Sequence, residues 1–400
     1  MSFLSAALSR VRPSPTVAIT AQAAAMRAEG RDVIALSAGE PDFDTPLHVR
    51  EAAKAAIDRG ETRYTAPDGL PALKEAIREK LARENGLSYA MDEVIASTGG
   101  KQVIFNALLA TLNPGDEVLI PAPYWVSYPD MARLCGGEAV ILPTRAEDGF
   151  RLRPETLAAA LTPRTKWLIL NSPGNPSGAG YTAADCAALA AVLERAPHVW
   201  VMSDEMYEHI AYAPFRFVAF AAAAPALKDR TLTVNGVSKA YAMTGWRIGY
   251  GAGPRALIGA MRTVQTQSTT NPSSVSQWAA IAALTGPQTH LAESVAAFRR
   301  RRDAVVAALS ATPGLSCPTP EGAFYVLPSC EGALGRRAPS GARLDDDAAF
   351  CAELLAAEGV ATVPGSAFGH PGAFRISYAA CDSVLQEACA RIGRFCAALT

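Results

Sequence analysis

From about residue 92 onward, short runs of β-branched and aliphatic residues alternate with longer stretches that are rich in alanine and leucine. The runs VIAST, DEVLIP, KWLIL, HVWVMSD, RTLTVNG and RIGYGAG predict strands, and stretches such as KQVIFNALLATL and AADCAALAAVLERA predict helices. Alternation of this kind is typical of α/β units around a mostly parallel sheet. We therefore predict an α/β fold in which helices flank the sheet and the loops at the strand ends carry the chemistry.

A second pattern begins near residue 288, where apolar residues follow a helical stripe as far as residue 311. The opposite face of this long helix holds the run Arg299 to Arg302, which we expect to be exposed to solvent. Beyond it, EGAFYVLPS, GVATVPG and AFRISYA predict strands, and residues 346–358 and 382–399 predict helices that cover them. The chain is therefore expected to end in a smaller α+β domain.

Composition narrows the class of protein. A chain of 400 residues exceeds what one core usually organises, so the length predicts two domains, or one large domain with a smaller satellite. The 37 basic and 38 acidic residues leave a net charge of -1, which offers no overall attraction for nucleic acid or an anionic membrane. With 50% hydrophobic and 19% charged residues, the chain can bury a large core. We expect a globular protein without nucleic-acid or membrane partners.

The cysteines and the N-terminus bear on location. The eight cysteines include no C-x-x-C pair, so neither a zinc site nor a disulfide scaffold is predicted, and no metal is expected. The N-terminal residues lack the basic start and long apolar stretch of a secretory signal. The most apolar segment, residues 217–227, is far shorter than the ~20 residues that cross a bilayer. Reduced thiols in the cytoplasm fit best.

The segment NGVSKAYAMTGWRIGYG, residues 235–251, carries the strongest chemical signal. A strand ends, Ser238 and Lys239 follow on a tight connection, and Arg247 comes just before the next strand. Among Ala, Met, Gly and Trp, a lysine is partly desolvated, which lowers its pKa and makes it a candidate for imine formation. The alternative for this segment taken alone is an ordinary surface lysine of a loop, and the pattern favours imine formation.

Three more strand ends carry polar motifs. STGGKQ, residues 97–102, is a glycine turn that opens a helix, whose free N–H groups suit a phosphate. NSPGNPSG places Asn175 in a proline-flanked turn, and SDEMY places Asp204 and Tyr207 after a buried strand. Singly, these motifs could be a helix cap, a plain turn and an N-cap. Dinucleotide-binding, P-loop, serine-hydrolase and zinc-protease motifs do not fit the sequence.

Together and in this order, the motifs resemble those of the fold-type-I pyridoxal-phosphate enzymes, and within them the class I aminotransferases of the aspartate aminotransferase family. The resemblance runs from LSAGEPDFDTP near the start to FRISYA near the end. It implies a homodimer with active sites at the subunit interface. It also implies an N-terminal arm with part of the small domain in residues 1–45, a large cofactor-binding domain in residues 46–290, and a small C-terminal domain in residues 291–400.

The resemblance also assigns roles around the cofactor. Lys239 resembles the lysine that holds pyridoxal 5'-phosphate as a Schiff base, and Asp204 resembles the carboxylate that keeps the pyridine nitrogen protonated. The remaining cofactor residues implied by the resemblance are Tyr207 and Asn175 at the phenolic oxygen, Trp125 stacked on the ring, Ser238, Arg247, Gly99, Gly100 and Lys101 at the phosphate, and Tyr64 at the partner subunit's phosphate.

For the substrate, the resemblance implies that Arg375 and the backbone N–H of Gly39 bind the α-carboxylate, beside Trp125 and Asn175. Lys101 and Arg12 match positions that bind a distal carboxylate, which favours aspartate and 2-oxoglutarate as substrates and prephenate as a second acceptor. Lys101 could instead serve the phosphate alone, and Arg12 could belong to a disordered arm. An aminotransferase for aromatic amino acids or alanine, a pyridoxal-phosphate lyase and a non-enzymatic ligand sensor remain the alternatives.

Overall fold

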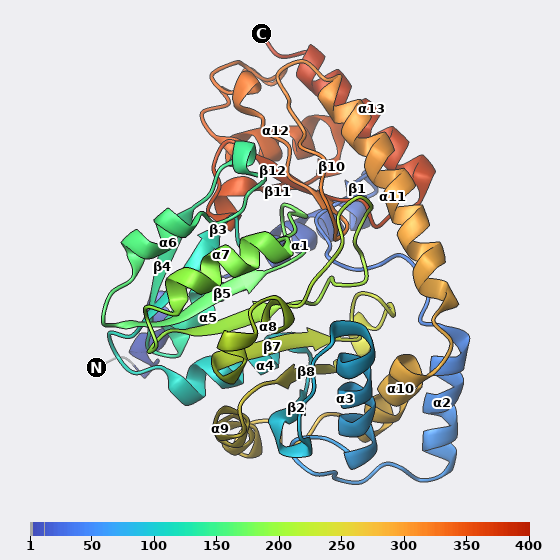
Figure 1. Ribbon diagram of the computed structural model, residues 1–400. Coiled ribbons are helices and arrows are strands. Elements are labelled where there is room, and N and C mark those ends of the chain that lie inside the picture. Colours follow the sequence, from blue (N-terminus) through green and yellow to red (C-terminus); the bar gives the residue numbers. More distant parts are fainter. Residues whose placement is uncertain (1–2, 12) are drawn as a thin grey trace.

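The computed structural model describes residues 3–11 and 13–400, and its centre is a seven-stranded sheet in the order β2-β8-β7-β6-β5-β3-β4 (Figure 1). Its strands are β2 (Val94–Ser97), β3 (Glu117–Ala122), β4 (Glu138–Pro143), β5 (Thr165–Asn171), β6 (Trp200–Asp204), β7 (Thr231–Gly236) and β8 (Gly249–Ala252). Neighbours from β4 to β7 pair in parallel, whereas β8 runs antiparallel to β7 and β2. The predicted mostly parallel α/β sheet is confirmed.

Helices cover both faces of this sheet. One face packs against α4 (Gly100–Thr111), α5 (Ser127–Leu134) and α9 (Arg255–Thr266). The other packs against α6 (Pro154–Ala160), α7 (Ala183–Leu193) and α8 (Phe220–Ala223), and near β2 against α2 (Leu47–Asp58), α3 (Pro71–Asn85) and α10 (Ser274–Thr285). Because successive strand residues face opposite ways, Ile169 joins the first core and Leu168 the second. Burial on both faces explains the unbroken apolar run KWLIL.

A long helix, α11 (Thr289–Ser310), connects these elements to the C-terminal ones and is the orange helix that runs from α10 toward α13 in Figure 1. The C-terminal sheet has the order β11-β12-β9, with β9 (Tyr325–Val326), β11 (Val363–Pro364) and β12 (Phe374–Ser377). Its helices are α12 (Asp347–Glu358) and α13 (Asp382–Ala397). The predicted helices at 288–311, 346–358 and 382–399 are confirmed within a few residues.

The N-terminal segment lies among these C-terminal elements. β1 (Ile34–Ala35) pairs in parallel with β10 (Val360–Ala361), and α1 (Pro15–Ala28) packs beside them. The predicted strand GVATVPG is therefore divided, because β10 pairs with β1 whereas β11 pairs with β12. The division of the chain at residues 45 and 290 stays a prediction.

The expectation that all four arginines of α11 face solvent was wrong for two of them. Arg301 and Arg302 are only 8% and 7% exposed. Arg301 donates to both carboxylate oxygens of Asp42, and Arg302 donates to the carbonyl of Pro320 and lies over the ring of Tyr212. A guanidinium can be buried where acceptors or an aromatic face meet its planar donors.

Sequence reasoning also missed β4, at the outer edge of the sheet. Only Leu142 of this strand is buried, so its pattern lacks the continuous apolar run of the central strands. Among the residues that the structure describes, no helix combines the length and the apolar character needed to span a membrane.

Candidate active site

The polar motifs meet at one edge of the main sheet. Ser97, Asn171, Asp204 and Gly236 each end a strand there. Because β8 runs the opposite way to β7, the connection through residues 237–248 leaves and returns at this same edge. Ligands of open α/β sheets bind outside such strand ends, and a cavity of about 510 Å³ lies here. The predicted residues that line it are Gly39, Gly100, Lys101, Trp125, Asn175, Asp204, Tyr207, Ser238, Lys239, Arg247 and Arg375.

The glycine turn between β2 and α4 forms one end of the cavity. Gly99 has a φ of 88°, a left-handed value that favours glycine, and a Cβ there would overlap the guanidinium of Arg247. A Cβ at Gly249 would overlap the backbone nitrogen of Gly100. Arg247 is held by a hydrogen bond to Thr244 O at 2.7 Å. The free N–H groups at the start of α4 and this cation together form a cradle for an anion.

Lys239 lies in the middle of the cavity. Its Nζ donates a hydrogen bond of 2.6 Å to the carbonyl oxygen of Gly39. Burial lowers the pKa of Lys239 to about 8, and the positive charges of Arg247 and Arg375 act in the same direction, against the charge of Glu40. The amine is therefore more readily freed of its proton near neutral pH than an ordinary lysine, as the sequence predicts.

Asp204 is a buried carboxylate, 7% exposed. Its Oδ2 accepts a hydrogen bond of 2.6 Å from the hydroxyl of Tyr128, and its Oδ1 accepts one of 3.2 Å from the N–H of Met206. Burial raises its pKa above 3.8, although these two hydrogen bonds oppose the rise. Within residues 3–11 and 13–400, no cation lies at ion-pair distance from it. Asp204 is therefore suited to a cationic partner supplied from outside the chain.

Arg375 is a buried cation, 2% exposed. Its guanidinium donates to Asn175 Oδ1 at 2.9 Å and to Ser37 O at 2.5 Å, and it lies between the rings of Tyr325 and Phe368. Both acceptors are neutral, its Nε has no hydrogen-bond partner, and no carboxylate of the described chain pairs with it. A buried cation with a free donor calls for an anionic ligand.

Two aromatic side chains shape the rest of the cavity. Tyr207 shares a hydrogen bond of 2.8 Å with the hydroxyl of Tyr325, and the two rings pack edge to face. Trp125 packs edge to face against Tyr128, and the Nζ of Lys101 lies 4.8 Å from the centre of the Trp125 ring. Burial, aided by the charge of Arg247, lowers the pKa of Lys101.

Comparison with known proteins identifies the family. Residues 31–392 match the family model described as aminotransferase class I and II. The chain is 60% identical over 400 residues to the aspartate/prephenate aminotransferase of Cereibacter sphaeroides, with all of both chains covered. It is 58% identical over 389 residues to an aspartate aminotransferase of Rhizobium meliloti, covering 97% of this chain and 95% of that protein.

Solved structures of aspartate aminotransferases have the same fold as this chain. The crystal structure of the aspartate aminotransferase from Rhizobium meliloti superposes with a TM-score of 0.97 at 57% identity, covering 100% of both chains. The aspartate aminotransferase of Thermus thermophilus with maleate gives 0.92 at 44% identity, covering 99% of this chain and 100% of the other. The chain belongs to the class I and II aminotransferase family.

Pyridoxal 5'-phosphate is the cofactor of this aminotransferase, and the cavity fits it. The glycine turn and Arg247 suit its phosphate, since glycine at 99 and 249 lets the backbone and the guanidinium approach closely. Asp204 offers a buried anion without a cation partner, which suits a protonated pyridine nitrogen. Lys239 offers an amine of lowered pKa for the aldehyde. Arg375 lines the same cavity and has no carboxylate partner in the described chain, which suits a substrate carboxylate.

Within the described residues of this aminotransferase, two predicted site residues, Tyr64 and Gly99, are not among those that line the cavity. Tyr64 is 89% exposed and does not line the cavity, and its contact with a partner subunit stays a prediction. Arg12 lies outside the described residues, although its neighbours Ser14 and Thr16 line the cavity. Gly99 stands at the rim, directly before α4.

Sequence reasoning missed several side chains that hold the predicted ones. Tyr128 contacts Asp204, Tyr325 contacts Tyr207, and Phe368 stacks on Arg375. Tyr128 was the one with a local signal, because it lies one helical turn after Trp125 in the motif PAPYWVSYP. Tyr325 and Phe368 come from distant strands and turns, so no spacing in the sequence connects them to their partners.

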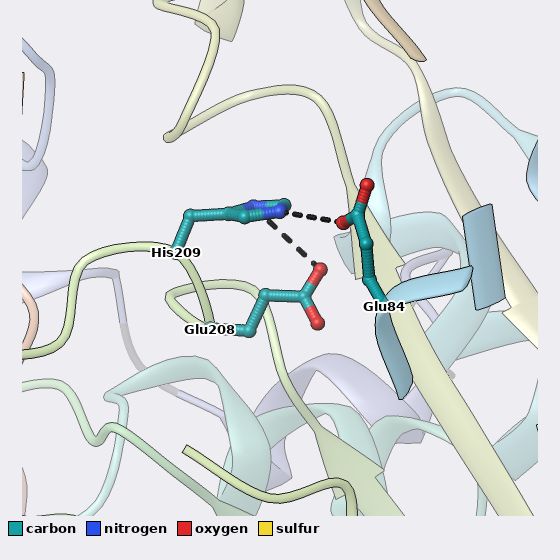
Figure 2. Close-up of side chains that lie close together, drawn as sticks. All are labelled: Glu84, Glu208 and His209. Carbon is teal, nitrogen blue, oxygen red and sulfur yellow. Dashed lines mark hydrogen bonds and ion pairs between the residues drawn. The ribbon is translucent and has the colours of Figure 1, made fainter. Parts of the chain in front are cut away.

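In this aminotransferase, the side chains of Glu84, Glu208 and His209 form a cluster (Figure 2). Their donor atoms lie close enough together that the cluster could hold a metal ion. The imidazole Nε2 lies 2.9 Å from Glu84, and the ammonium of the fully buried Lys80 contacts both Glu208 and Asn85 Oδ1. Burial alone would raise the pKa of Glu84, but His209 and Lys80 lower it to about 2. Because Lys80 already supplies the cation, we assign no metal to this cluster, and the expectation of no metal stays a prediction.

Proposed function

We propose that the chain transfers an amino group between aspartate and 2-oxoglutarate, giving oxaloacetate and glutamate, and that prephenate serves as a second acceptor, giving arogenate. The observation that carries the proposal is a pair of cations beside Lys239 in one cavity, the buried Arg375 and the cavity-lining Lys101. A dicarboxylic acid offers one carboxylate to each. The relative from Cereibacter sphaeroides is named for aspartate and prephenate, and the relative from Rhizobium meliloti is named for aspartate, which supports these two substrates.

For the residue roles, we propose those that the resemblance implies. Bound pyridoxal phosphate supplies a ring that withdraws electrons from the substrate Cα. Asp204 holds a proton on the ring nitrogen, and the Lys239 amine takes the Cα proton and later returns it. The residues that hold the cofactor are Tyr207, Asn175, Trp125, Ser238, Arg247, Gly99, Gly100 and Lys101. Arg375 and the N–H of Gly39 bind the α-carboxylate, and the role of Arg12 in prephenate binding stays a prediction.

Single-turnover spectra of the cofactor-loaded protein against a panel of amino acids test the proposal. Aspartate and glutamate are expected to convert the cofactor fully, and apolar and aromatic amino acids slowly. Preferred conversion by aromatic donors would replace the substrate assignment. Elimination products would indicate a lyase, and ligand binding without spectral conversion would indicate a sensor.

Lys101→Ala is expected to lower kcat/KM for aspartate by about tenfold or more, and for alanine by less than about threefold, because a charged pocket rejects substrates that leave its cation unpaired. Steady-state kinetics with both donors measure the two ratios. Lys54→Ala is the matched control, since Lys54 is an exposed lysine of α2 outside the cavity lining. Equal losses for aspartate and alanine would show that Lys101 serves the cofactor phosphate alone.

We also propose that the active form is a homodimer to which Tyr64 contributes across the interface, which its exposure supports. Two inactive chains, Lys239→Ala and Tyr64→Ala, are expected to recover about a quarter of wild-type activity when reassembled, because half the dimers are mixed and one site in each is complete. Lys239→Ala mixed with Asp204→Asn is the control, since both residues line the same cavity and no complete site forms. Full activity of a monomer would contradict the proposal.

The cytoplasm remains the proposed location. All eight cysteines are unpaired within the described part of the chain, and seven of them are buried or half-buried, which suits a reducing compartment.

A further inference from the structure

The loop of residues 37–45, between β1 and α2, crosses the cavity beside Lys239. At its start, the carbonyl of Ser37 accepts from Arg375. At its end, the Thr45 hydroxyl donates to Ala242 O at 2.6 Å and accepts from the indole N–H of Trp246 at 3.0 Å. Between these anchors, the carbonyl of Gly39 accepts from Lys239. The position of the loop therefore decides where the backbone of Gly39 stands relative to Arg375 and Lys239.

Arg301 of α11 forms an ion pair with Asp42, in the middle of this loop. Its Nη1 and Nη2 donate to the two carboxylate oxygens of Asp42 at 2.8 and 2.9 Å, which is a bidentate pair. The next residue, Phe43, packs edge to face on Phe298 of α11 with ring centres 5.2 Å apart, and the guanidinium of Arg301 lies 5.3 Å from the Phe43 ring. The loop is thus attached to α11 by a charged pair and an aromatic pair side by side.

The setting makes this pair stronger than an ordinary surface ion pair. The side chain of Arg301 is 8% exposed and that of Asp42 is 24% exposed, whereas the neighbouring Arg300 is 62% exposed. The Nε of Arg301 also donates to Asp382 of α13 at 3.1 Å, so all three donor positions of its fork are used. A bidentate, largely buried guanidinium holds both direction and distance, which a lysine cannot do.

We propose that Arg301 is a positioning residue for the amino-acid carboxylate site, acting through Asp42 to hold the 37–45 loop where Gly39 shares the carboxylate with Arg375. The inference rests on the proposed function, because it takes Gly39 and Arg375 as the carboxylate ligands. Arg301 itself does not line the cavity in which we propose that substrate and cofactor bind. Its effect is therefore expected on substrate binding more than on the chemical step.

Kinetics of the cofactor-loaded variants test this inference. Asp42→Asn, which keeps the shape and removes the charge, is expected to raise KM for aspartate, alanine and 2-oxoglutarate about tenfold, as loss of a charged hydrogen bond does, with kcat changed less than about threefold. Cofactor absorbance is expected to stay that of the wild type. Arg301→Met is expected to raise KM similarly, and Arg301→Lys to rescue part of the loss. The double variant Asp42→Asn/Arg301→Met is expected to raise KM no further than either single variant does, because each single variant already breaks the ion pair between Asp42 and Arg301.

Arg300→Met is the matched control, since Arg300 shares Asp382 with Arg301 but does not contact Asp42. An unchanged KM in Asp42→Asn, or an equal rise in Arg300→Met, would overturn the inference. If Arg301→Met fails to fold, Asp42→Asn alone decides. Alanine separates this result from the substrate proposal, because every amino acid has an α-carboxylate. If the wild type turns over no amino acid, backbone amide hydrogen exchange tests the inference instead. Faster exchange across residues 37–45 in Asp42→Asn than in the wild type would support the role of the Asp42–Arg301 pair in holding the loop, and unchanged exchange would overturn it.

Discussion

Lys239→Ala is expected to lower transamination on the order of 10³-fold or more, because the variant lacks the amine that takes the Cα proton. The Nζ of Lys239 lies in the cavity, 2.6 Å from Gly39 O, and its pKa is lowered to about 8. Among the other cations of the cavity, Arg247 and Arg375 are guanidiniums, which stay protonated and cannot act as bases, and the Nζ of Lys101 lies over the Trp125 ring, 4.8 Å from its centre. The loss is measured as kcat/KM for aspartate in the cofactor-loaded variant.

Borohydride reduction gives an independent measurement. In the wild type, peptide mapping is expected to find the reduced cofactor on Lys239, and the alanine variant is expected to bind cofactor without covalent label. Lys101→Ala is the control, since this lysine lines the same cavity but should leave the label in place. Label on any other lysine would show that Lys239 has been assigned wrongly.

The stability of the cofactor-free protein adds a pH test for the same lysine. Between its folded pKa of about 8 and its ordinary value of 10.5, the folded chain releases a proton that the unfolded chain keeps. Stability therefore rises with pH across this window relative to Lys239→Ala, which lacks the group. Thermal unfolding of both proteins from pH 7 to 10 measures the difference.

Asp204→Asn is expected to lower kcat on the order of 10³-fold, because the amide keeps the shape but loses the charge that stabilises a protonated pyridine nitrogen. The carboxylate is 7% exposed and is held in place by the hydroxyl of Tyr128 and the N–H of Met206. Single-turnover rates with aspartate measure this effect directly. Near-normal rates in the asparagine variant would refute the assignment.

Thermal unfolding tests whether a folding defect, and not the lost charge, causes the lower rate of Asp204→Asn. Burial raises the pKa of Asp204 in the folded chain above its ordinary value of 3.8. Between the ordinary pKa and this raised pKa, the folded chain keeps a proton that the unfolded chain has released. Stability is therefore lost as pH rises through that window, and the ionised carboxylate destabilises the cofactor-free fold at neutral pH. Cofactor-free Asp204→Asn is expected to unfold at the same temperature as the wild type or higher. A lower unfolding temperature would mean that the side chain is needed for the fold itself.

The central strands and the residues at their ends could be predicted because both signals are local. An apolar run such as KWLIL is buried on both faces, and Asp204 and Lys239 each follow directly after such a run. The edge strand β4 has no such run, because one buried side chain is enough to attach it to the sheet. Local patterns therefore predicted the strand ends that meet at the cavity, whereas Gly39, Trp125 and Arg375 were implied by the resemblance to the aminotransferase family.

The contacts that position these residues could not be predicted from spacing. Arg301 and Asp42 are 259 residues apart, and Arg375 and Ser37 are 338 apart. A run of four arginines on a helix normally indicates a solvated face. Only the packing of α11 against the 37–45 loop and α13 shows that Arg301 forms ion pairs with two aspartates, Asp42 and Asp382.

The pairing of β1 with β10 has a consequence for how the protein is made. Synthesis proceeds from the N-terminus, and domains generally fold as units as they emerge. Ile34 can find its partner Val360 only when nine-tenths of the polypeptide exists, and Ser37 must wait longer still for Arg375. Contacts of such long sequence separation form slowly because the intervening chain must first be ordered. The proposed carboxylate site is therefore among the last parts to assemble, and a nascent or truncated chain that has already built its central sheet is expected to lack it.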